Sequence, residues 1–143
     1  MAWGDPELID SLRGQALFAD LDDLALAHIA NVATPLEVDT GYVLIDAGQE
    51  GTGLFILEEG SVSVEIGSRS IECSAGEFIG ELSLLVDGLV HTGRVRAATP
   101  LKCLAISRLD FDRLLRDEPQ IAINMLRALA RRLAETDRML ARG

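Results

Sequence analysis

The chain has 143 residues and carries 23 acidic against 13 basic side chains, for a net charge of −10. Its length predicts a single domain over residues 1–143, and its composition, 48% hydrophobic and 25% charged, is typical of a folded globular protein. The negative charge argues against DNA, RNA or an anionic membrane surface as the main partner, because each of these is a polyanion.

The charge is divided unevenly along the chain. Residues 1–90 hold 17 acids and two arginines, a net of −15, whereas residues 91–143 hold six acids and eleven bases, a net of +5. The second part is therefore the better place to bind an anion.

The two cysteines, Cys73 and Cys103, lie 30 residues apart in apolar, strand-like surroundings without a CxxC motif. Buried free thiols are the favoured interpretation over a disulfide or a metal site. The sequence shows no signal-peptide pattern and no apolar run long enough to cross a bilayer. We therefore expect no membrane insertion and a cytoplasmic location.

Residues 5–33 are predicted to be helical. Asp5 can cap a first helix that begins with Pro6, where the missing N–H costs nothing, and Asp20 and Asp22 can cap a second. The residues that recur at helical spacing in this second helix are Leu24, Ala27, His28 and Val32.

Residues 34–106 hold ten of the 13 glycines, set between short alternating runs. These runs cover residues 42–46, 54–58, 62–66, 70–74, 94–98 and 101–106. Short strands separated by turn glycines predict an antiparallel barrel or jelly roll. Residues 107–143 return to a helical pattern, in which Ser107 can cap a helix over 109–116 and a helix of about twenty residues follows Pro119.

No constellation of catalytic or metal-binding residues is present in the sequence. His28 and His91 are 63 residues apart, and neither has a carboxylate or cysteine at ligand spacing. The HxH pair that a metal site on a β-roll would need is missing. We therefore expect no enzyme activity and no metal, and we interpret His28 as a packed or half-exposed helix residue.

One segment, residues 76–85, interrupts the strand pattern with a short helical turn led by Gly80. A helix start exposes backbone N–H groups and carries about half a positive charge, so it can hold a phosphate. Gly80 allows close approach of a ligand, and Glu81 can accept a hydrogen bond from a sugar hydroxyl. The alternative is a connecting turn in which Glu81 only favours the helix dipole.

Five segments carry a resemblance to a known family. They are residues 41–48 (GYVLIDAG), 54–62 (LFILEEGSV), 76–82 (GEFIGEL), 95–99 (VRAAT) and 104–107 (LAIS). In this order and at these spacings they closely resemble the cyclic nucleotide-binding domain family of bacterial activators and protein kinase A regulatory subunits. The resemblance implies an α+β fold, in which an antiparallel β-roll with a phosphate-binding cassette at 76–92 is flanked by N-terminal helices and two C-terminal helices.

The resemblance also implies a ligand and its contacts. In this family the cassette amides and an arginine hold the cyclic phosphate, a glutamate binds the ribose 2′-hydroxyl, and the last helix covers the purine. Gly80, Glu81 and Leu82 match the start of the cassette, with Glu81 as the ribose glutamate, and Thr136 matches a hydroxyl that meets adenine. The implied ligand is a cyclic nucleotide, cAMP before cGMP, with no further cofactor.

His91 and Thr92 stand where the bacterial activators have the phosphate arginine and a small hydroxyl residue. Histidine lacks the permanent charge and the two-pronged fork of arginine. A charge-assisted hydrogen bond contributes about 1.5–3 kcal/mol, so we expect binding weaker by about one to two orders of magnitude. Arg94 and Arg96 can substitute or can face solvent, because they alternate with Val95 and Ala97.

The last helix carries a coiled-coil-like stripe. Its members are Ala122, Leu126, Leu129, Leu133, Thr136 and Leu140. This stripe either packs on the chain's own barrel or forms the seam of a homodimer. No helix-turn-helix follows before Gly143, so we expect no DNA contact by this chain.

Two functions remain open. The first is a regulatory module that binds a cyclic nucleotide and signals through its C-terminal helices. The second is a degenerate, non-binding domain that serves protein interaction or dimerisation. His91 is the residue that separates them.

Overall fold

The computed structural model describes residues 5–49, 53–89 and 93–142. Its helical elements are α1 (Pro6–Arg13), the 3₁₀ turn η1 (Ala16–Phe18), α2 (Asp23–Val32), α3 (Glu81–Leu85), α4 (Arg108–Asp117) and α5 (Pro119–Ala141). Its strands are β1 (Thr34–Val38), β2 (Val43–Ile45), β3 (Gly53–Glu59), β4 (Ser61–Ile66), β5 (Arg69–Ser74), β6 (Phe78–Ile79), β7 (Arg94–Ala97) and β8 (Leu101–Ser107).

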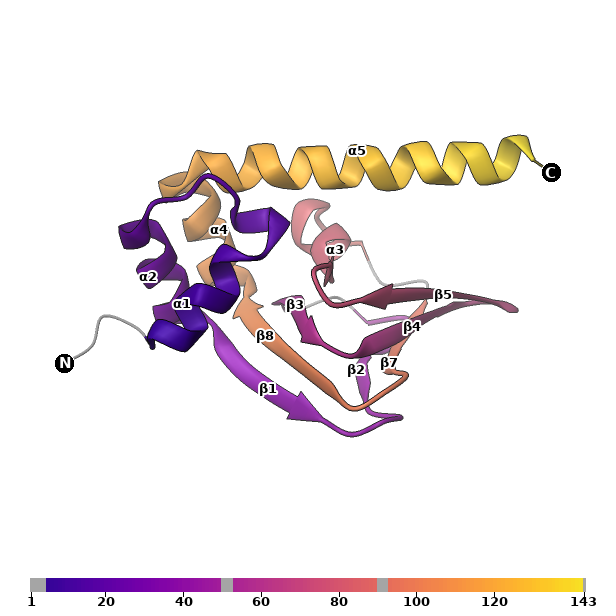
Figure 1. Cartoon of the computed structure of the whole chain (residues 1–143). Coiled ribbons are helices and arrows are strands. Elements are labelled where there is room, and N and C mark those ends of the chain that lie inside the picture. The colour runs from indigo at the N-terminus through magenta and orange to yellow at the C-terminus, as the bar shows by residue number, and fades with distance from the viewer. Residues whose placement is uncertain (1–4, 50–52, 90–92, 143) are drawn as a thin grey trace.

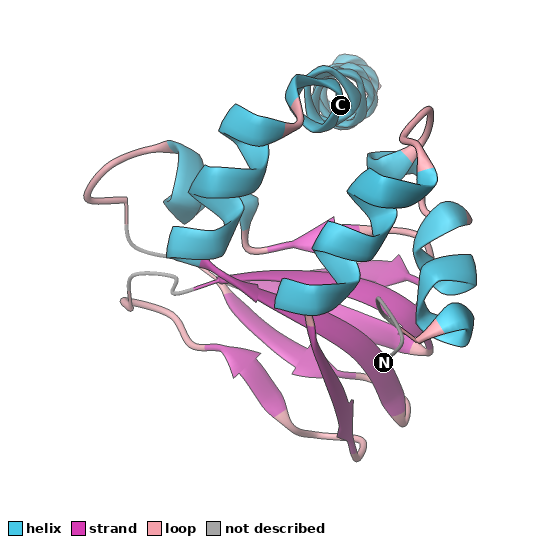
Figure 2. Ribbon diagram, turned by 90° about the vertical axis from the view of Figure 1, so that its left-hand side faces the viewer, coloured by secondary structure: helices cyan, strands magenta, loops and turns pink. Residues whose placement is uncertain are grey.

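The strands of the described chain form two antiparallel sheets that together make a β-roll. Their orders are β1-β8-β3-β6 and β2-β7-β4-β5. The helices gather on one side of the roll (Figure 2), and the long α5 runs above α3 and past it (Figure 1). This arrangement confirms the α+β class and the flanked roll that the sequence predicts.

The central strands β3 and β8 are apolar on both faces. On β3, Leu54 and Ile56 contact the helices, whereas Leu57 faces the interior of the roll. On β8, Ile106 and Cys103 divide in the same way. Two cores therefore meet at this sheet, which explains why these strands have nearly continuous apolar sequences rather than a clean alternation.

The six predicted runs correspond to β2, β3, β4, β5, β7 and β8, whereas β1 and β6 are not predicted. Pro35 lies within β1, and the sheet tolerates it because β1 is an edge strand that, among the described strands, pairs only with β8. The strand β6 has two residues, which is too short to show any period.

The helix caps are mostly as predicted. Asp5, Asp22 and Ser107 each accept a hydrogen bond from the first turn of α1, α2 and α4. Asp20 caps nothing and instead takes a left-handed conformation, with φ at 66°, in the turn before α2.

The residues noted at helical spacing in α2 divide between the core and solvent, since Ala27 is buried and Val32 packs against the core. Leu24 is 74% exposed and His28 is also exposed, whereas Leu26 and Ile29 are fully buried. The packed face of α2 centres on Leu26 and Ile29, so it includes Ala27 but leaves Leu24 and His28 on the exposed side. His28 is thus an exposed helix residue.

Both cysteines are free thiols, as predicted. Cys103 is buried in the interior of the roll, and this burial raises the pKa of its thiol to about 11. Cys73 is half-buried at the edge of the cavity described below.

The first half of α5 is fixed to the N-terminal helices by one buried amide. Asn124 is 6% exposed, and its Nδ2 donates to the carbonyl oxygens of Leu17 at 3.0 Å and Ala19 at 2.8 Å. Ile121 and Met125 pack into the core on either side of it. This end of α5 is therefore held both by apolar contacts and by hydrogen bonds.

We predict that Asn124→Ala lowers the free energy of unfolding by about 2–3 kcal/mol, because one buried and one partly buried carbonyl lose their donor. Urea unfolding measures this loss. The exposed Arg127 on the same helix supplies the control, and Arg127→Ala should stay within about 0.5 kcal/mol of the wild type. Equal stability of the two variants would contradict the anchoring role.

Candidate functional site

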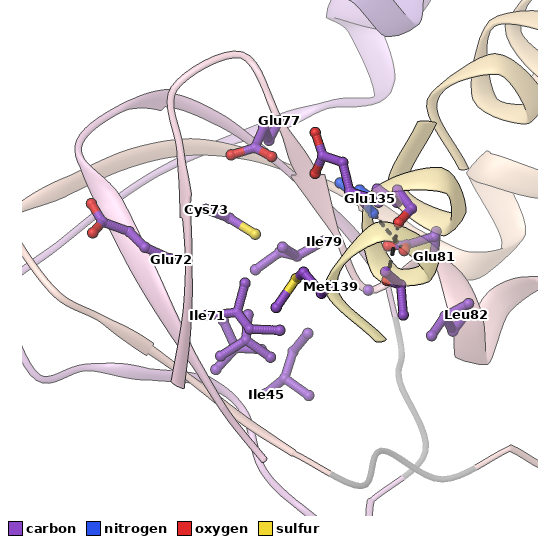
Figure 3. Close-up of a pocket in the computed structure, with 15 residues that line it drawn as sticks. Ile45, Ile71, Glu72, Cys73, Glu77, Ile79, Glu81, Leu82, Glu135 and Met139 are labelled. Carbon is purple, nitrogen blue, oxygen red and sulfur yellow. Dashed lines mark hydrogen bonds and ion pairs between the residues drawn. The ribbon is translucent and has the colours of Figure 1, made fainter. Parts of the chain in front are cut away.

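A cavity of about 370 Å³ lies between the β-roll and the second half of α5 (Figure 3). Strands β4 and β5, the start of α3 and α5 all contribute to its walls. Its lining residues are Ile45, Val64, Ile71, Glu72, Cys73, Glu77, Ile79, Gly80, Glu81, Leu82, Val95, Arg132, Glu135, Thr136 and Met139. Four predicted site residues, Gly80, Glu81, Leu82 and Thr136, are thus brought together from segments more than 50 residues apart.

The start of α3 depends on the glycine that precedes it. Gly80 has φ at 94°, a left-handed conformation that side-chain-bearing residues rarely adopt. A Cβ at this position would lie 2.6 Å from the carbonyl oxygen of Gly53 on β3. The close approach that requires Gly80 is therefore to the neighbouring strand, and it fixes where α3 begins relative to the roll.

Glu81 forms the centre of a cluster that joins α3 to α5. Its side chain is 8% exposed, and its Oε1 accepts a hydrogen bond from Nη1 of Arg132 at 2.7 Å. Nη2 of Arg132 donates to the carbonyl oxygen of Phe78, and the guanidinium carbon lies 4.4 Å from the centre of the Phe78 ring. Arg132 thus makes a charge-assisted bond, a backbone bond and a cation–π contact at once.

Thr136 lies one helical turn after Arg132 and faces the same cavity. Its hydroxyl donates to the carbonyl oxygen of Arg132 at 3.0 Å. The proton of the hydroxyl is therefore used within the helix, and the oxygen offers lone pairs to a donor in the cavity. Leu82, by contrast, lies at the margin, away from the apolar cluster around Ile71 (Figure 3).

The cavity has an apolar floor and an acidic rim. Glu72, Glu77, Glu81 and Glu135 line it, and Arg132 is the one basic residue among the described lining residues. Cys73 faces this environment, where burial first and the Glu77 carboxylate second raise the pKa of its thiol. The described walls therefore favour apolar and hydrogen-bond-donating groups over a bare anion.

Arg94 and Arg96 lie outside the cavity. Arg94 forms an ion pair with Asp46 at 3.0 Å, and Arg96 forms one with Glu65 at 3.0 Å. Val95 between them lines the cavity. The alternation along β7 therefore turns both arginines away from the site, and neither stands in for the phosphate arginine.

His91 and Thr92 lie outside the described residues, so the phosphate-contacting part of the predicted cassette has no structural account. Within the described chain, no group of three or more histidine, cysteine or acidic side chains is placed to hold a metal ion. Of the helices in the same described ranges, none has the length and apolarity that crossing a membrane requires.

Arg132 is the residue that sequence reasoning missed. In the sequence it is one of several arginines beside the predicted stripe of the last helix. The available signal was its spacing, because Arg132 precedes Thr136 by four residues and positions i and i+4 share a helix face. Glu135 and Met139 reach the cavity from the same side of α5.

The predicted stripe of α5 is divided by the structure. Leu129 packs against the core and Thr136 lines the cavity, whereas Leu126, Leu133 and Leu140 are 67%, 63% and 73% exposed. One portion of the stripe therefore packs on its own domain, whereas the exposed portion leaves the homodimer seam a prediction.

Comparison with known proteins agrees with this geometry. Residues 35–118 match the family model described as cyclic nucleotide-binding domain. The crystal structure of the Thermus thermophilus catabolite activator protein superposes with a TM-score of 0.75 at 29% identity, over 89% of this chain and 62% of that one.

Two bacterial relatives are each 34% identical. A cyclic nucleotide-gated potassium channel of Rhizobium etli matches 74% of this chain and 30% of its own length. A cAMP-activated global transcriptional regulator of Pasteurella multocida matches 68% of this chain and 50% of its own length. The shared part is thus at most half of either relative. The chain belongs to the cyclic nucleotide-binding domain family.

Proposed function

We propose that residues 1–143 form one cytoplasmic regulatory unit that binds a cyclic nucleotide, cAMP in preference to cGMP, and signals through α5. The observation that carries the proposal is the position of Glu81, a buried carboxylate at the start of α3 that opens on a cavity covered by α5. Two related proteins are named for cyclic nucleotides, one as gated by them and one as activated by cAMP.

Glu81 is the proposed partner of the ribose 2′-hydroxyl. Arg132 binds its Oε1, which fixes the rotamer of the side chain and leaves Oε2 as a further acceptor. A sugar hydroxyl can donate to a carboxylate that is already held in place, so little side-chain entropy is lost on binding.

Thr136 and the second half of α5 are the proposed contacts of the base. The exocyclic amine of adenine is a donor and matches the lone pairs that Thr136 Oγ1 offers. Guanine carries a carbonyl oxygen at the same position of the ring, which supports cAMP over cGMP. The apolar floor around Ile71 and Ile79 gives the purine ring a surface on which to pack.

The cyclic phosphate is the weak point of the proposed site. The proposed phosphate contacts are Gly80, Leu82 and the α3 amides together with His91 and Thr92, by their resemblance to the family's cassette. The four carboxylates that line the cavity oppose an anion, and Arg132 is already bound to one of them. We therefore expect modest affinity, and the acidic rim is the observation that favours the degenerate, non-binding alternative.

Isothermal calorimetry tests the proposal. Wild type should bind cAMP more tightly than cGMP, and His91→Arg should bind about tenfold to a hundredfold more tightly because a permanent cation returns to the phosphate. Glu81→Gln should weaken cAMP binding by about tenfold, since the ribose acceptor loses its charge.

The control for this experiment is Glu37→Gln, which neutralises an exposed glutamate on β1 and should leave the affinity unchanged. Absence of binding at millimolar cAMP in both wild type and His91→Arg would contradict the sensor function and support the interaction module.

A second copy of the chain is the proposed partner of α5. The residues that face outward recur at alternating spacings of three and four: Ile123, Leu126, Ala130, Leu133, Asp137 and Leu140. This is the a and d pattern of a coiled coil, shifted from the register that the sequence alone predicts. In a coiled coil, the side chains at these positions pack between side chains of the facing helix. The α5 helix of a second copy has the same pattern, so the pattern favours a homodimer.

Sedimentation analysis of Leu133→Asp tests the dimer. The substitution replaces an apolar seam residue by a second acid one turn from Asp137, so we predict a fall from dimer to monomer mass. Arg131→Asp on the same turn lies off the seam and serves as the control with dimer mass. A wild type that sediments as a monomer at high micromolar concentration would remove the dimer claim.

A further inference from the structure

The helix α3 is too short to hold its own position. It has five residues, so most of its backbone groups lack an intrahelical partner. One side of it packs against the roll through Leu84, whereas Leu82 and Leu85 are 53% and 44% exposed. Its orientation must therefore be set by contacts from outside the helix.

Two arginines from different C-terminal helices provide such contacts, one at the first residue of α3 and one at its middle residue. Arg132 of α5 binds the Glu81 carboxylate at the first residue. Arg108, the first residue of α4, donates from Nη2 to the carbonyl oxygen of Ser83 at 2.7 Å. The carbonyl oxygen of Leu82 accepts a hydrogen bond from the Val86 N–H within the helix. Arg108 donates to the carbonyl of the following residue, Ser83.

The bond to Ser83 lies in a protected environment. Ser83 is 1% exposed, and Arg108 is half-buried. A cationic donor that meets a helix carbonyl away from water forms a strong, directional bond. Loss of this donor would leave a buried carbonyl with less than its full set of partners.

Arg108 is also rigidly connected to the core. Ser107 caps α4 directly before it, and Phe111 and Leu114 of the same helix are 1% exposed in the core beneath the N-terminal helices. A shift of α3 is therefore transmitted through Arg108 to α4, which is separate from the route through Arg132 to α5.

We propose that Arg108 is a positioning residue, which holds the cassette helix α3 in its binding orientation through the Ser83 carbonyl and couples that helix to α4 independently of Arg132 and α5. The coupling of ligand to α4 rests on the proposed function, whereas the positioning of α3 does not. Within α3, Arg108 donates to the carbonyl oxygen of Ser83, and the ammonium group of a lysine can donate to the same oxygen. Arg132 makes three different contacts, so lysine cannot replace it.

The ligand-free arm of the test is hydrogen exchange measured by mass spectrometry. In Arg108→Met, amides of α3, including Val86 N–H, should exchange at least threefold faster than in wild type. Arg108→Lys should exchange at the wild-type rate. Arg113→Met removes an exposed arginine from the same helix and is the matched control. If Arg108→Met does not fold, Arg108→Gln takes its place with the same expectation.

The ligand-bound arm repeats the exchange with saturating cAMP. Wild type should gain protection in both α4 and α5. In Arg108→Met, the ligand-induced protection of α4 should disappear while that of α5 persists. In Arg132→Met, the protection of α5 should disappear while that of α4 persists. A role in folding alone would not separate the two helices.

The proposal is overturned if α3 exchanges no faster in Arg108→Met than in Arg113→Met, or if ligand-induced protection of α4 survives the loss of Arg108. A wild type that binds no cyclic nucleotide would remove the proposed function, and the ligand-free arm would then decide the role of Arg108 by itself.

Discussion

The contact of Arg132 with Glu81 and Phe78 determines where the second half of α5 lies. Up to Leu129 the helix is fixed by apolar packing and by Asn124, but every residue from 133 to 142 is exposed. Glu81 is almost fully buried and Arg132 is one-third exposed. For a pair of this kind we expect a contribution of about 2 kcal/mol, close to that of a charge-assisted hydrogen bond. Because Arg132 also lines the cavity, we expect the cavity beneath α5 to change shape when that contact is lost.

The Glu81 carboxylate therefore combines a structural contact with a proposed binding role. It anchors α5, and it is the proposed acceptor for the ligand. A ligand can shift the position of α5 only by the difference in its affinity for the two arrangements of the helix. A group that engages Glu81 and Thr136 together meets this condition, because both belong to the interface between the cassette and α5. The acidic rim limits the affinity, and Arg108 gives the cassette a second connection to the C-terminal helices.

Much of the fold is predictable from local pattern, and less of the site is. Glycine-bounded alternation indicates six of the strands, and capping residues such as Asp5 and Ser107 indicate where helices begin. The edge strand β1 is not predicted, because it contains a proline, a residue that normally argues against a strand. Gly80 and Glu81 are found because the cassette is a contiguous motif. Arg132 is not, because its role depends on a tertiary contact across 51 residues that no local spacing encodes.

The claim that Arg132 holds α5 over the cavity is tested most directly by measuring the distance between α5 and the β4–β5 hairpin. Double electron–electron resonance between two spin labels gives this distance. Spin labels are attached at Arg138→Cys and Arg69→Cys, because both positions are exposed. The native thiols are first removed by Cys73→Ser and Cys103→Ala, so that only these two positions are labelled. With Arg132 present, we predict a single narrow distance distribution. Arg132→Met should broaden it toward longer distances, whereas Arg131→Met should not. An unchanged narrow distribution in Arg132→Met would contradict the claim that this arginine holds α5 over the cavity.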